Sequence, residues 1–200
     1  MSTGSSRYTN AMNDQEEGYL TGQLLIAMPG MADPRFARTV VYVCAHNEEG
    51  AMGLVINRLI GSITFPDLLE QLEIESAGLG QDIEVHFGGP VESGRGFVLH
   101  STEYEQDGTL KVNDLMSLTA TIDILRDIAS GGGPRLSMLA LGYAGWGPGQ
   151  LDSEIQGNGW LNVEADEGLV FDQNLDGKWE RAISKIGIDP SMLSGDAGHA

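Results

Sequence analysis

The sequence predicts an α+β fold in a single domain, built on a mixed β-sheet. Short apolar, β-branched runs outnumber amphipathic ones, and the connections between them alternate hairpin turns with helical stretches. The 28 glycines stand mainly at the ends of apolar runs, as is typical of tight turns between short strands. A length of 200 residues with 41% hydrophobic residues fits one domain with a sizeable core.

Strands are predicted where apolar and β-branched residues run between turn signals. These runs lie at residues 22–28, 39–45, 51–57, 84–87, 96–100, 136–141, 160–163 and 169–171. Pro29-Gly30 ends the first, and the turn Asn47 to Gly50 joins the second to the third. The run 136–141 alternates poorly and carries no charge, which predicts a central strand.

Helices are predicted in three places. Thr64 is expected to cap a short one, with Asp67 three residues after the cap. The clearest runs from Leu115 to Ala129, because its apolar residues recur at three- and four-residue spacing before a stop at Gly131-Gly132-Gly133-Pro134. The last runs over 177–186, with Gly187 as its C-terminal stop.

The domain is expected to span residues 18–190. Residues 1–17 are polar and show no periodicity, so they are expected to be a disordered lead-in. Residues 191–200 have similar composition and are expected to be a flexible tail.

A net charge of −18 is spread along the chain, and there is no cluster of Lys or Arg. Such a field repels phosphate backbones and anionic membranes, so direct nucleic-acid binding and membrane binding are not expected. The single Cys44 excludes an intramolecular disulfide and fits a reducing compartment. No signal peptide or apolar run of 18 residues is present, so the expected location is the cytoplasm.

Familiar catalytic and cofactor motifs are missing. The chain has no P-loop, no G-x-G-x-x-G fingerprint and no G-x-S-x-G elbow. Residues 172–177 imitate the start of a calcium loop, but Ile183 stands where a bidentate Glu is required. Cys44 and His46 share one face of a strand, and a buried thiol beside a strand-end His explains them better than a metal site. No metal and no cofactor are therefore expected.

The least generic stretch runs over 141–151, where an apolar strand gives way to glycines, aromatics and a proline. Tyr143, Trp146 and Trp160 could line a ligand slot or a partner surface, with Gln150 and Glu154 as polar contacts. They could equally be core residues under a glycine-rich turn.

A second glycine-rich segment runs from Gly88-Gly89-Pro90 to Arg95. Its exposed backbone N–H groups could form an anion-binding loop. A turn between two strands, with glycines at positive φ, is the simpler interpretation.

Distinctive segments follow one another along residues 20–188. They are Gly22 to Pro29, Thr39-Val40-Val41 with His46, Gly50 to Arg58, Gly88 to Val91, Leu99-His100, and Leu141 to Leu151 followed by Glu154, Trp160-Leu161 and Phe171. Together they resemble the bacterial YqgE/AlgH family of uncharacterised proteins. One departure is Leu59, which stands where the family usually has a proline after Asn57-Arg58.

The resemblance implies a compact α+β fold whose β-sheet curls into a pseudo-barrel, and it implies no established enzymatic activity. Some members carry the label of putative transcriptional regulator, linked to alginate production. The sequence shows no basic recognition helix, so a regulatory role is expected to act through a protein partner or small molecule.

The leading hypothesis is a non-catalytic binding or regulatory protein. Its candidate surface consists of Tyr143, Gly145, Trp146, Gly149, Gln150, Glu154, Gly88, Gly89, Pro90, Arg95, His46 and Asn57. The alternative is an enzyme of unknown class with a pocket near Tyr143–Leu151, using His46, His100, Asn57 and Glu154. A third interpretation is that these residues are purely architectural.

Overall fold

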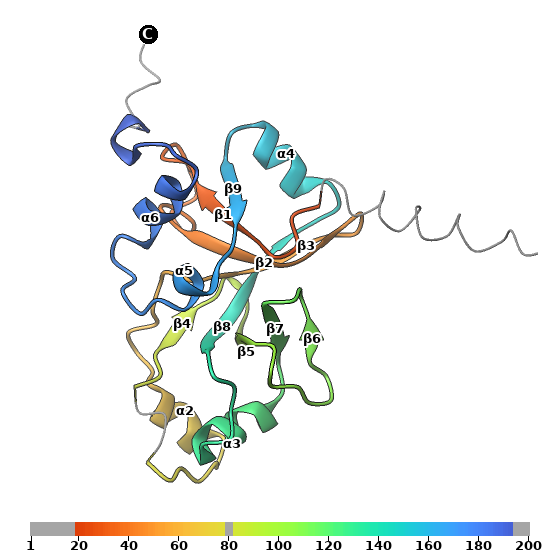
Figure 1. Ribbon diagram of the computed structural model, residues 1–200, viewed down its shortest axis with the longest axis vertical. Helices are drawn as coiled ribbons and strands as arrows, with labels where there is room; N and C mark the ends of the chain where they lie inside the picture. Colours follow the sequence, from red (N-terminus) through yellow and green to blue (C-terminus); the bar gives the residue numbers. More distant parts are fainter. Residues whose placement is uncertain (1–18, 79–81, 194–200) are drawn as a thin grey trace, which may run out of the picture.

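The computed structural model describes residues 19–78 and 82–193 (Figure 1). The strands are β1 Gln23–Ala27, β2 Val40–Asn47, β3 Gly50–Val55, β4 Val85–Phe87, β5 Val91–Ser101, β6 Leu110–Lys111, β7 Met116–Thr119, β8 Ser137–Trp146 and β9 Trp160–Glu164. The helices are α2 Phe65–Gln71, α3 Ile122–Ser130, α4 Gln150–Gln156, α5 Glu167–Phe171, α6 Lys178–Lys185 and the 3₁₀ turn η1 Pro190–Met192.

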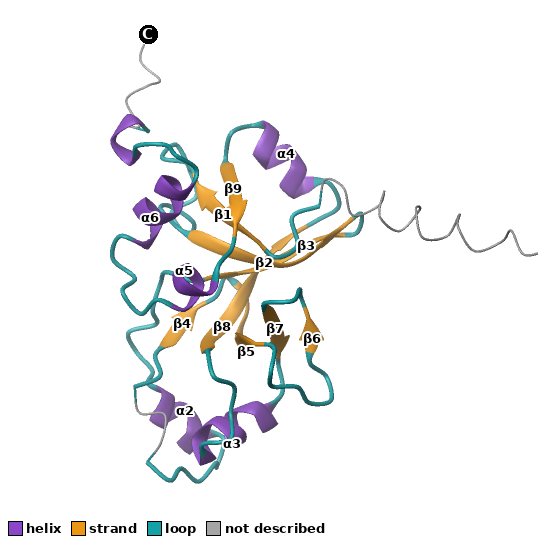
Figure 2. Ribbon diagram, viewed as in Figure 1, coloured by secondary structure: helices purple, strands orange, loops and turns teal. Residues whose placement is uncertain are grey.

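All nine strands belong to one sheet in the order β6-β7-β5-β8-β3-β2-β1-β9, with β4 beside β8. Every pairing is antiparallel except β4 with β8, which is parallel. The sheet curls into a half-barrel and the helices lie around it (Figure 2). The predicted α+β class with a mixed, curled sheet is confirmed.

Strand β8 connects the two halves of the sheet. On one side it pairs with β5, for example Leu139 with Val98. On its other side it pairs first with β4, up to Leu141, and then with β3, from Ala144. The change of partner falls at Gly142, whose φ of 74° lies in the left-handed region that favours glycine. The prediction of a central strand here is confirmed.

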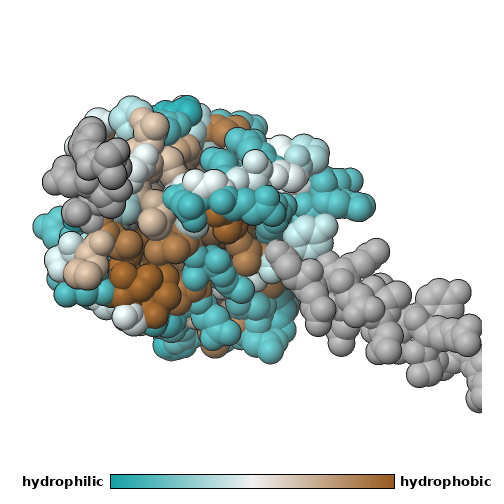
Figure 3. Space-filling model, turned by 90° about the horizontal axis from the view of Figure 1, so that it is seen from above, coloured by the Kyte–Doolittle hydropathy of each residue, from teal (hydrophilic) through white to brown (hydrophobic). Residues whose placement is uncertain are grey.

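Apolar clusters cover both faces of the sheet, so the sequences of its buried strands are continuously apolar and do not alternate with polar residues. In β1, Leu24 and Ile26 join a cluster that includes Trp179 of α6, whereas Leu25 and Ala27 join one covered by α4. A third cluster packs α2 and α3 against β5 and β8 at the other end. Not all apolar surface is covered: seen from above, hydrophobic residues gather in one area bordered by hydrophilic ones (Figure 3).

The predicted helix from Leu115 to Ala129 is wrong in its first half. Residues Met116–Thr119 form β7, and only Ile122–Ser130 is helical. The Asn113 side chain accepts hydrogen bonds from the backbone N–H groups of residues 115 and 116, which turns the chain into the strand. Pairing with β5 then buries all four residues of β7, so tertiary contacts override the helical spacing.

Two other predictions change. Residues 169–171 belong to α5 and not to a strand, because Asp166 Oδ1 accepts from the backbone N–H of Leu169 at 2.7 Å and caps a helix. The turn expected up to Arg95 is shorter, since β5 already begins at Val91 and has a register shift before Gly96. Two predicted helices are confirmed. Thr64 forms a full capping box at the start of α2, and the helix predicted over 177–186 is α6.

The expected lead-in, residues 1–17, lies outside the described residues. Of the expected tail, residues 191–193 are described, and Ser191 and Met192 belong to η1. The rest of the tail lies outside the described residues.

Candidate functional site

An open apolar groove of about 700 Å³ lies between the β2–β3 hairpin and the β6–β7 hairpin. Both hairpins are on the right in Figure 1. We call it the sheet groove. It is lined by residues of β3, β5, β6, β7 and the end of β8, among them Met52, Phe97, Leu110, Leu118, Tyr143 and Trp146. The pairing of Trp146 with Ala51 and of Tyr143 with Val91 brings these distant segments together.

Large apolar side chains in and beside the groove are exposed to solvent. Leu110 is 50% exposed and Val91 is 36% exposed. Uncovered apolar residues that gather in one hollow are the usual mark of a binding surface, whereas single ones are ordinary.

Arg95 is the basic residue of the groove lining. Its guanidinium lies 5.1 Å from the centroid of the Phe97 ring and 3.4 Å from the carboxylate of Glu92. Both members of the ion pair are about half exposed, so the pair contributes little to stability and is free to exchange.

Of the residues predicted for the candidate surface, the structure brings Tyr143, Gly145, Trp146 and Arg95 to the sheet groove. Gly149 and Gln150 form the turn into α4 instead. Gly149 has a φ of 70°, and Gln150 Oε1 accepts from the backbone N–H of Gly147 at 2.9 Å.

Gly88, Gly89 and Pro90 connect β4 to β5, and both backbone polar groups of Gly88 are already hydrogen-bonded. The Gly88 N–H donates to Leu141 O at 2.8 Å, and Gly88 O accepts from Val55 N at 2.8 Å. A Cβ on Gly89 would lie 2.0 Å from the carbonyl carbon of Tyr143. The turn interpretation of this segment is therefore favoured, and its glycines permit close contact with β8.

Trp146 also belongs to the core under α4, where its ring meets Trp160 edge-on at 6.0 Å between centroids. Trp160 is 2% exposed, so it is a core residue.

Glu154 lies beside the indoles of Trp146 and Trp160. Burial raises the pKa of its carboxyl, and the indole N–H groups of Trp160 and Trp146 only partly oppose the rise. Trp160 Nε1 and Glu154 Oε2 are buried without a hydrogen bond of ordinary geometry.

His46 and Asn57 have structural partners. His46 Nδ1 accepts from the backbone N–H of Leu20 at 3.0 Å, and its Nε2 lies 3.5 Å from Asp152 Oδ2. Asn57 Oδ1 accepts from Val40 N and its Nδ2 donates to Arg38 O, both at 2.9 Å. Both residues tie loops to the sheet.

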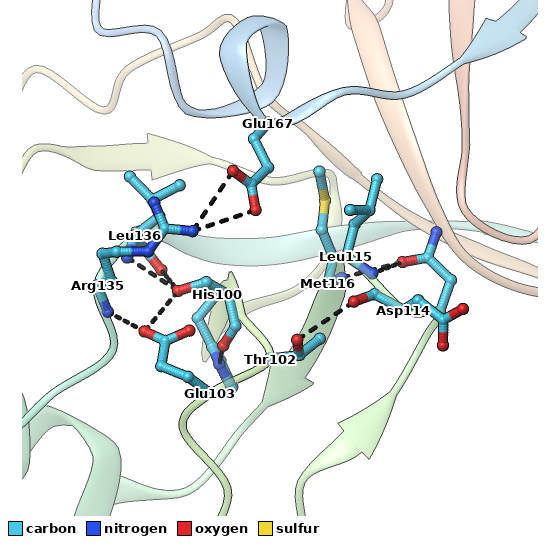
Figure 4. Close-up of polar contacts among 11 residues, drawn as sticks. His100, Thr102, Glu103, Asp114, Leu115, Met116, Arg135, Leu136 and Glu167 are labelled. Carbon is cyan, nitrogen blue, oxygen red and sulfur yellow. Dashed lines mark hydrogen bonds and ion pairs between the residues drawn. The ribbon is translucent and has the colours of Figure 1, made fainter.

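The two histidines of the enzyme hypothesis do not converge. His100 pairs with Ser137 at the start of β8, whereas His46 pairs with Ala51, which pairs with Trp146 at its end. At about 3.3 Å per residue, the two ends of β8 lie roughly 30 Å apart. His100 is buried and contacts Ser101 O and Thr119 Oγ1, both at 2.8 Å. Figure 4 shows it in a polar network with Glu103 and Arg135 nearby.

Cys44 is buried, and burial raises the pKa of its thiol to about 12, so it is not a ready nucleophile. In residues 19–78 and 82–193, no three His, Cys, Asp or Glu side chains are grouped as metal ligands. Among these same residues, none of the helices has the length and apolar character needed to cross a membrane.

Sequence reasoning missed Met52, Leu110 and Leu118 as groove residues. Leu118 lies in the predicted helix 115–129, and the sequence does not predict the β6–β7 hairpin that carries Leu110. The available signal for that hairpin was Asn113-Asp114 in the connection from β6 to β7, a pair that suits a helix cap as well as a turn.

Comparison with known proteins identifies relatives over almost the whole chain. A UPF0301 protein of Rhodospirillum rubrum is 58% identical over 186 residues, which cover 93% of this chain and 97% of the relative. The UPF0301 protein blr1492 of Bradyrhizobium diazoefficiens is 54% identical, covering 98% of this chain and 95% of the relative.

Solved structures with the same fold are also found. The solution structure of the AlgH protein from Pseudomonas aeruginosa is 40% identical, with a TM-score of 0.76 and full coverage of both chains. The crystal structure of protein DIP2367 from Corynebacterium diphtheriae shares the fold at 21% identity, with a TM-score of 0.67 and coverage of 96% and 97%. Residues 24–191 match the family model described as DUF179, AlgH-like. The resemblance noted in the sequence is thereby confirmed: the chain belongs to the AlgH-like, UPF0301 family.

Proposed function

We propose that this is a non-catalytic, cytoplasmic binding protein that recognises a partner with the sheet groove, and that any regulatory role follows from that contact. The observation that carries the proposal is the exposure of Leu110 and Val91 at a hollow that also contains Phe97, Tyr143 and Trp146. Covering these side chains would remove apolar surface from water, which is the main driving force of association.

The residue types that line the sheet groove support a binding role more than a catalytic one. The groove lining offers aromatic and aliphatic surface with Arg95 and Glu49 as its charged residues, and the histidines of the described chain are not among its lining residues. His46, His100, Asn57 and Glu154 have separate structural surroundings, so the enzyme hypothesis gains no support from them.

The proposal is tested with Nile red, a neutral apolar dye that fluoresces when it leaves water. Wild type should bind the dye, and Leu110→Asp should weaken that binding at least roughly fivefold, since it places a charge in the groove. The matched control is Leu59→Asp, because Leu59 is similarly exposed at 44% but lies outside the groove lining. Equal dye binding by wild type and Leu110→Asp would contradict the proposal.

A further inference from the structure

The rim of the sheet groove is mainly acidic. Exposed carboxylates border the lining at three places: Glu48 and Glu49 in the β2–β3 hairpin, Glu92 next to Val91 in β5, and Asp107 next to Gly108. The basic residues nearby are already paired, Arg95 with Glu92 and Lys111 with Asp114 at 3.6 Å. The whole chain adds a net charge of −18. A cationic partner would therefore be attracted to the groove and an anionic one repelled.

The shape of the groove favours a peptide segment over a small molecule. Small-molecule sites bury most of their ligand, whereas this hollow of about 700 Å³ is widely open to solvent. An apolar floor with a charged rim matches one apolar face of an amphipathic segment, with charged side chains on its flanks.

Pairing in the sheet determines which kind of segment fits. The strands β3, β5 and β8 at the floor lie in the interior of the sheet order. The part of β5 that β7 does not cover, Val91 to Phe97, has a register shift against β8 and a Glu92 φ of 46°, so it is not a regular edge for an added strand. An extended peptide adds to a sheet only at a free strand edge, and the edge strand β6 has two residues. Recognition in the groove must therefore rely on side chains, as when a helix places residues i, i+3, i+4 and i+7 in an apolar groove.

We infer, on the basis of the proposed function, that the occupant of the sheet groove is an amphipathic helical segment of a partner protein with Lys or Arg flanking its apolar face. Its leucine-like side chains lie on Phe97, Leu110 and Tyr143. Its cationic side chains face Glu48, Glu49 and Asp107.

The test uses two fluorescein-labelled 14-residue helical peptides with the same Leu face, one with Lys and one with Glu on the flanks. Fluorescence anisotropy should show that the Lys peptide binds at least about tenfold more tightly than the Glu peptide in 0.1 M salt. Glu49→Lys should weaken binding of the Lys peptide roughly three- to tenfold. Asp107→Lys carries the same expectation if the first variant fails to fold.

The matched control is Glu164→Lys, which changes the net charge equally but lies on β9, at the opposite edge of the sheet from β6. It should change binding of the Lys peptide less than about twofold. An equal effect of Glu164→Lys and Glu49→Lys would mean attraction by net charge alone and would overturn the inference.

Leu110→Asp separates this inference from the proposed function. If Leu110→Asp abolishes Nile red binding but the Lys peptide binds no better than the Glu peptide, the groove binds ligands and the cationic occupant is wrong. If Leu110→Asp leaves both the dye and the Lys peptide unaffected, both proposals fail.

Discussion

His46 Nε2 lies 3.5 Å from Asp152 Oδ2, across the junction between the end of β2 and the first turn of α4. Because His46 Nδ1 accepts a hydrogen bond from the Leu20 N–H, the proton of the neutral ring belongs on Nε2, facing the carboxylate. One imidazole thus holds two segments that are distant in sequence.

Replacing His46 with Ala should lower the free energy of unfolding by about 1–3 kcal/mol, since the partly buried Leu20 N–H would lose its acceptor. Urea denaturation measures the loss, and hydrogen exchange at Leu20 should accelerate. The comparison variant Asp152→Asn should cost less than about 1 kcal/mol, because the Asp152 side chain is 46% exposed. If Asp152→Asn destabilises the protein as much as His46→Ala, the Leu20 hydrogen bond is not the main contribution.

Lys178 is fully buried, and its Nζ donates to Val170 O at 3.1 Å and to Ile56 O at 3.4 Å. Burial lowers the pKa of this amine from 10.5 to about 8, although Asp172 opposes the shift. Between pH 8 and pH 10.5 the unfolded chain therefore binds a proton that the folded chain does not, so this group makes stability rise with pH.

The difference in unfolding free energy between wild type and Lys178→Met should consequently move in favour of wild type by on the order of 2 kcal/mol from pH 8 to pH 10. Urea titrations at both pH values measure it. Tyr42 and Cys44, whose pKa values burial raises, act in the opposite direction but are present in both proteins and cancel. A difference that does not change with pH would refute a buried, readily deprotonated Lys178.

Gly89→Ala should cost more than about 3 kcal/mol or prevent folding, because the new Cβ would lie 2.0 Å from backbone atoms of Tyr143. Neither backbone can withdraw without breaking the β8 pairing. Gly94→Ala is the matched control, since a Cβ there has no neighbour within 4 Å, and it should change stability by less than about 1 kcal/mol. Thermal unfolding followed by circular dichroism distinguishes the two, and equal melting temperatures would contradict the close contact.

Glu154→Gln should stabilise the protein more at pH 7 than at pH 4. The folded-state pKa of Glu154 is raised by burial, so the wild type gains from this group below pH 4.5 and loses that gain as pH rises through the folded pKa. Gln cannot ionise and does not incur the loss. Melting temperatures of both proteins at the two pH values test this, with Glu164→Gln as the exposed control. A constant difference between wild type and Glu154→Gln would show that the carboxylate is not desolvated.

The sequence predicted the fold correctly where neighbouring residues alone determine the local structure. Thr64 and Asp67 form a capping box within four residues, and the uncharged run 136–141 needed no partner to be recognised as central. Residues 115–119 failed because their spacing also suits a helix. Only the presence of Leu99 opposite Leu118 decides for the strand, and sequence spacing alone does not reveal that pairing.

The residues of the candidate site also fall into two groups, those that the local sequence identifies and those that depend on long-range pairing. Arg95, Tyr143 and Trp146 were identified by residue type beside glycines, and they reach the groove. Leu110 is not predicted because its position depends on the β6–β7 hairpin pairing with β5 in the sheet, which is a long-range arrangement. For Trp160 the sequence leaves a binding surface and a core position equally open, because an aromatic ring after a glycine suits both, and its burial in the structure decides for the core.

The position of β8 has a consequence for how the protein is made. Strands β3, β4 and β5 all leave the ribosome before β8, yet each needs β8 as a neighbour. When the chain has emerged from the ribosome only as far as about residue 136, it therefore carries two sheet fragments with open backbone edges and no strand to join them. Until ten more residues emerge, neighbouring polypeptides compete for those edges, so a pause in translation at this point would favour aggregation.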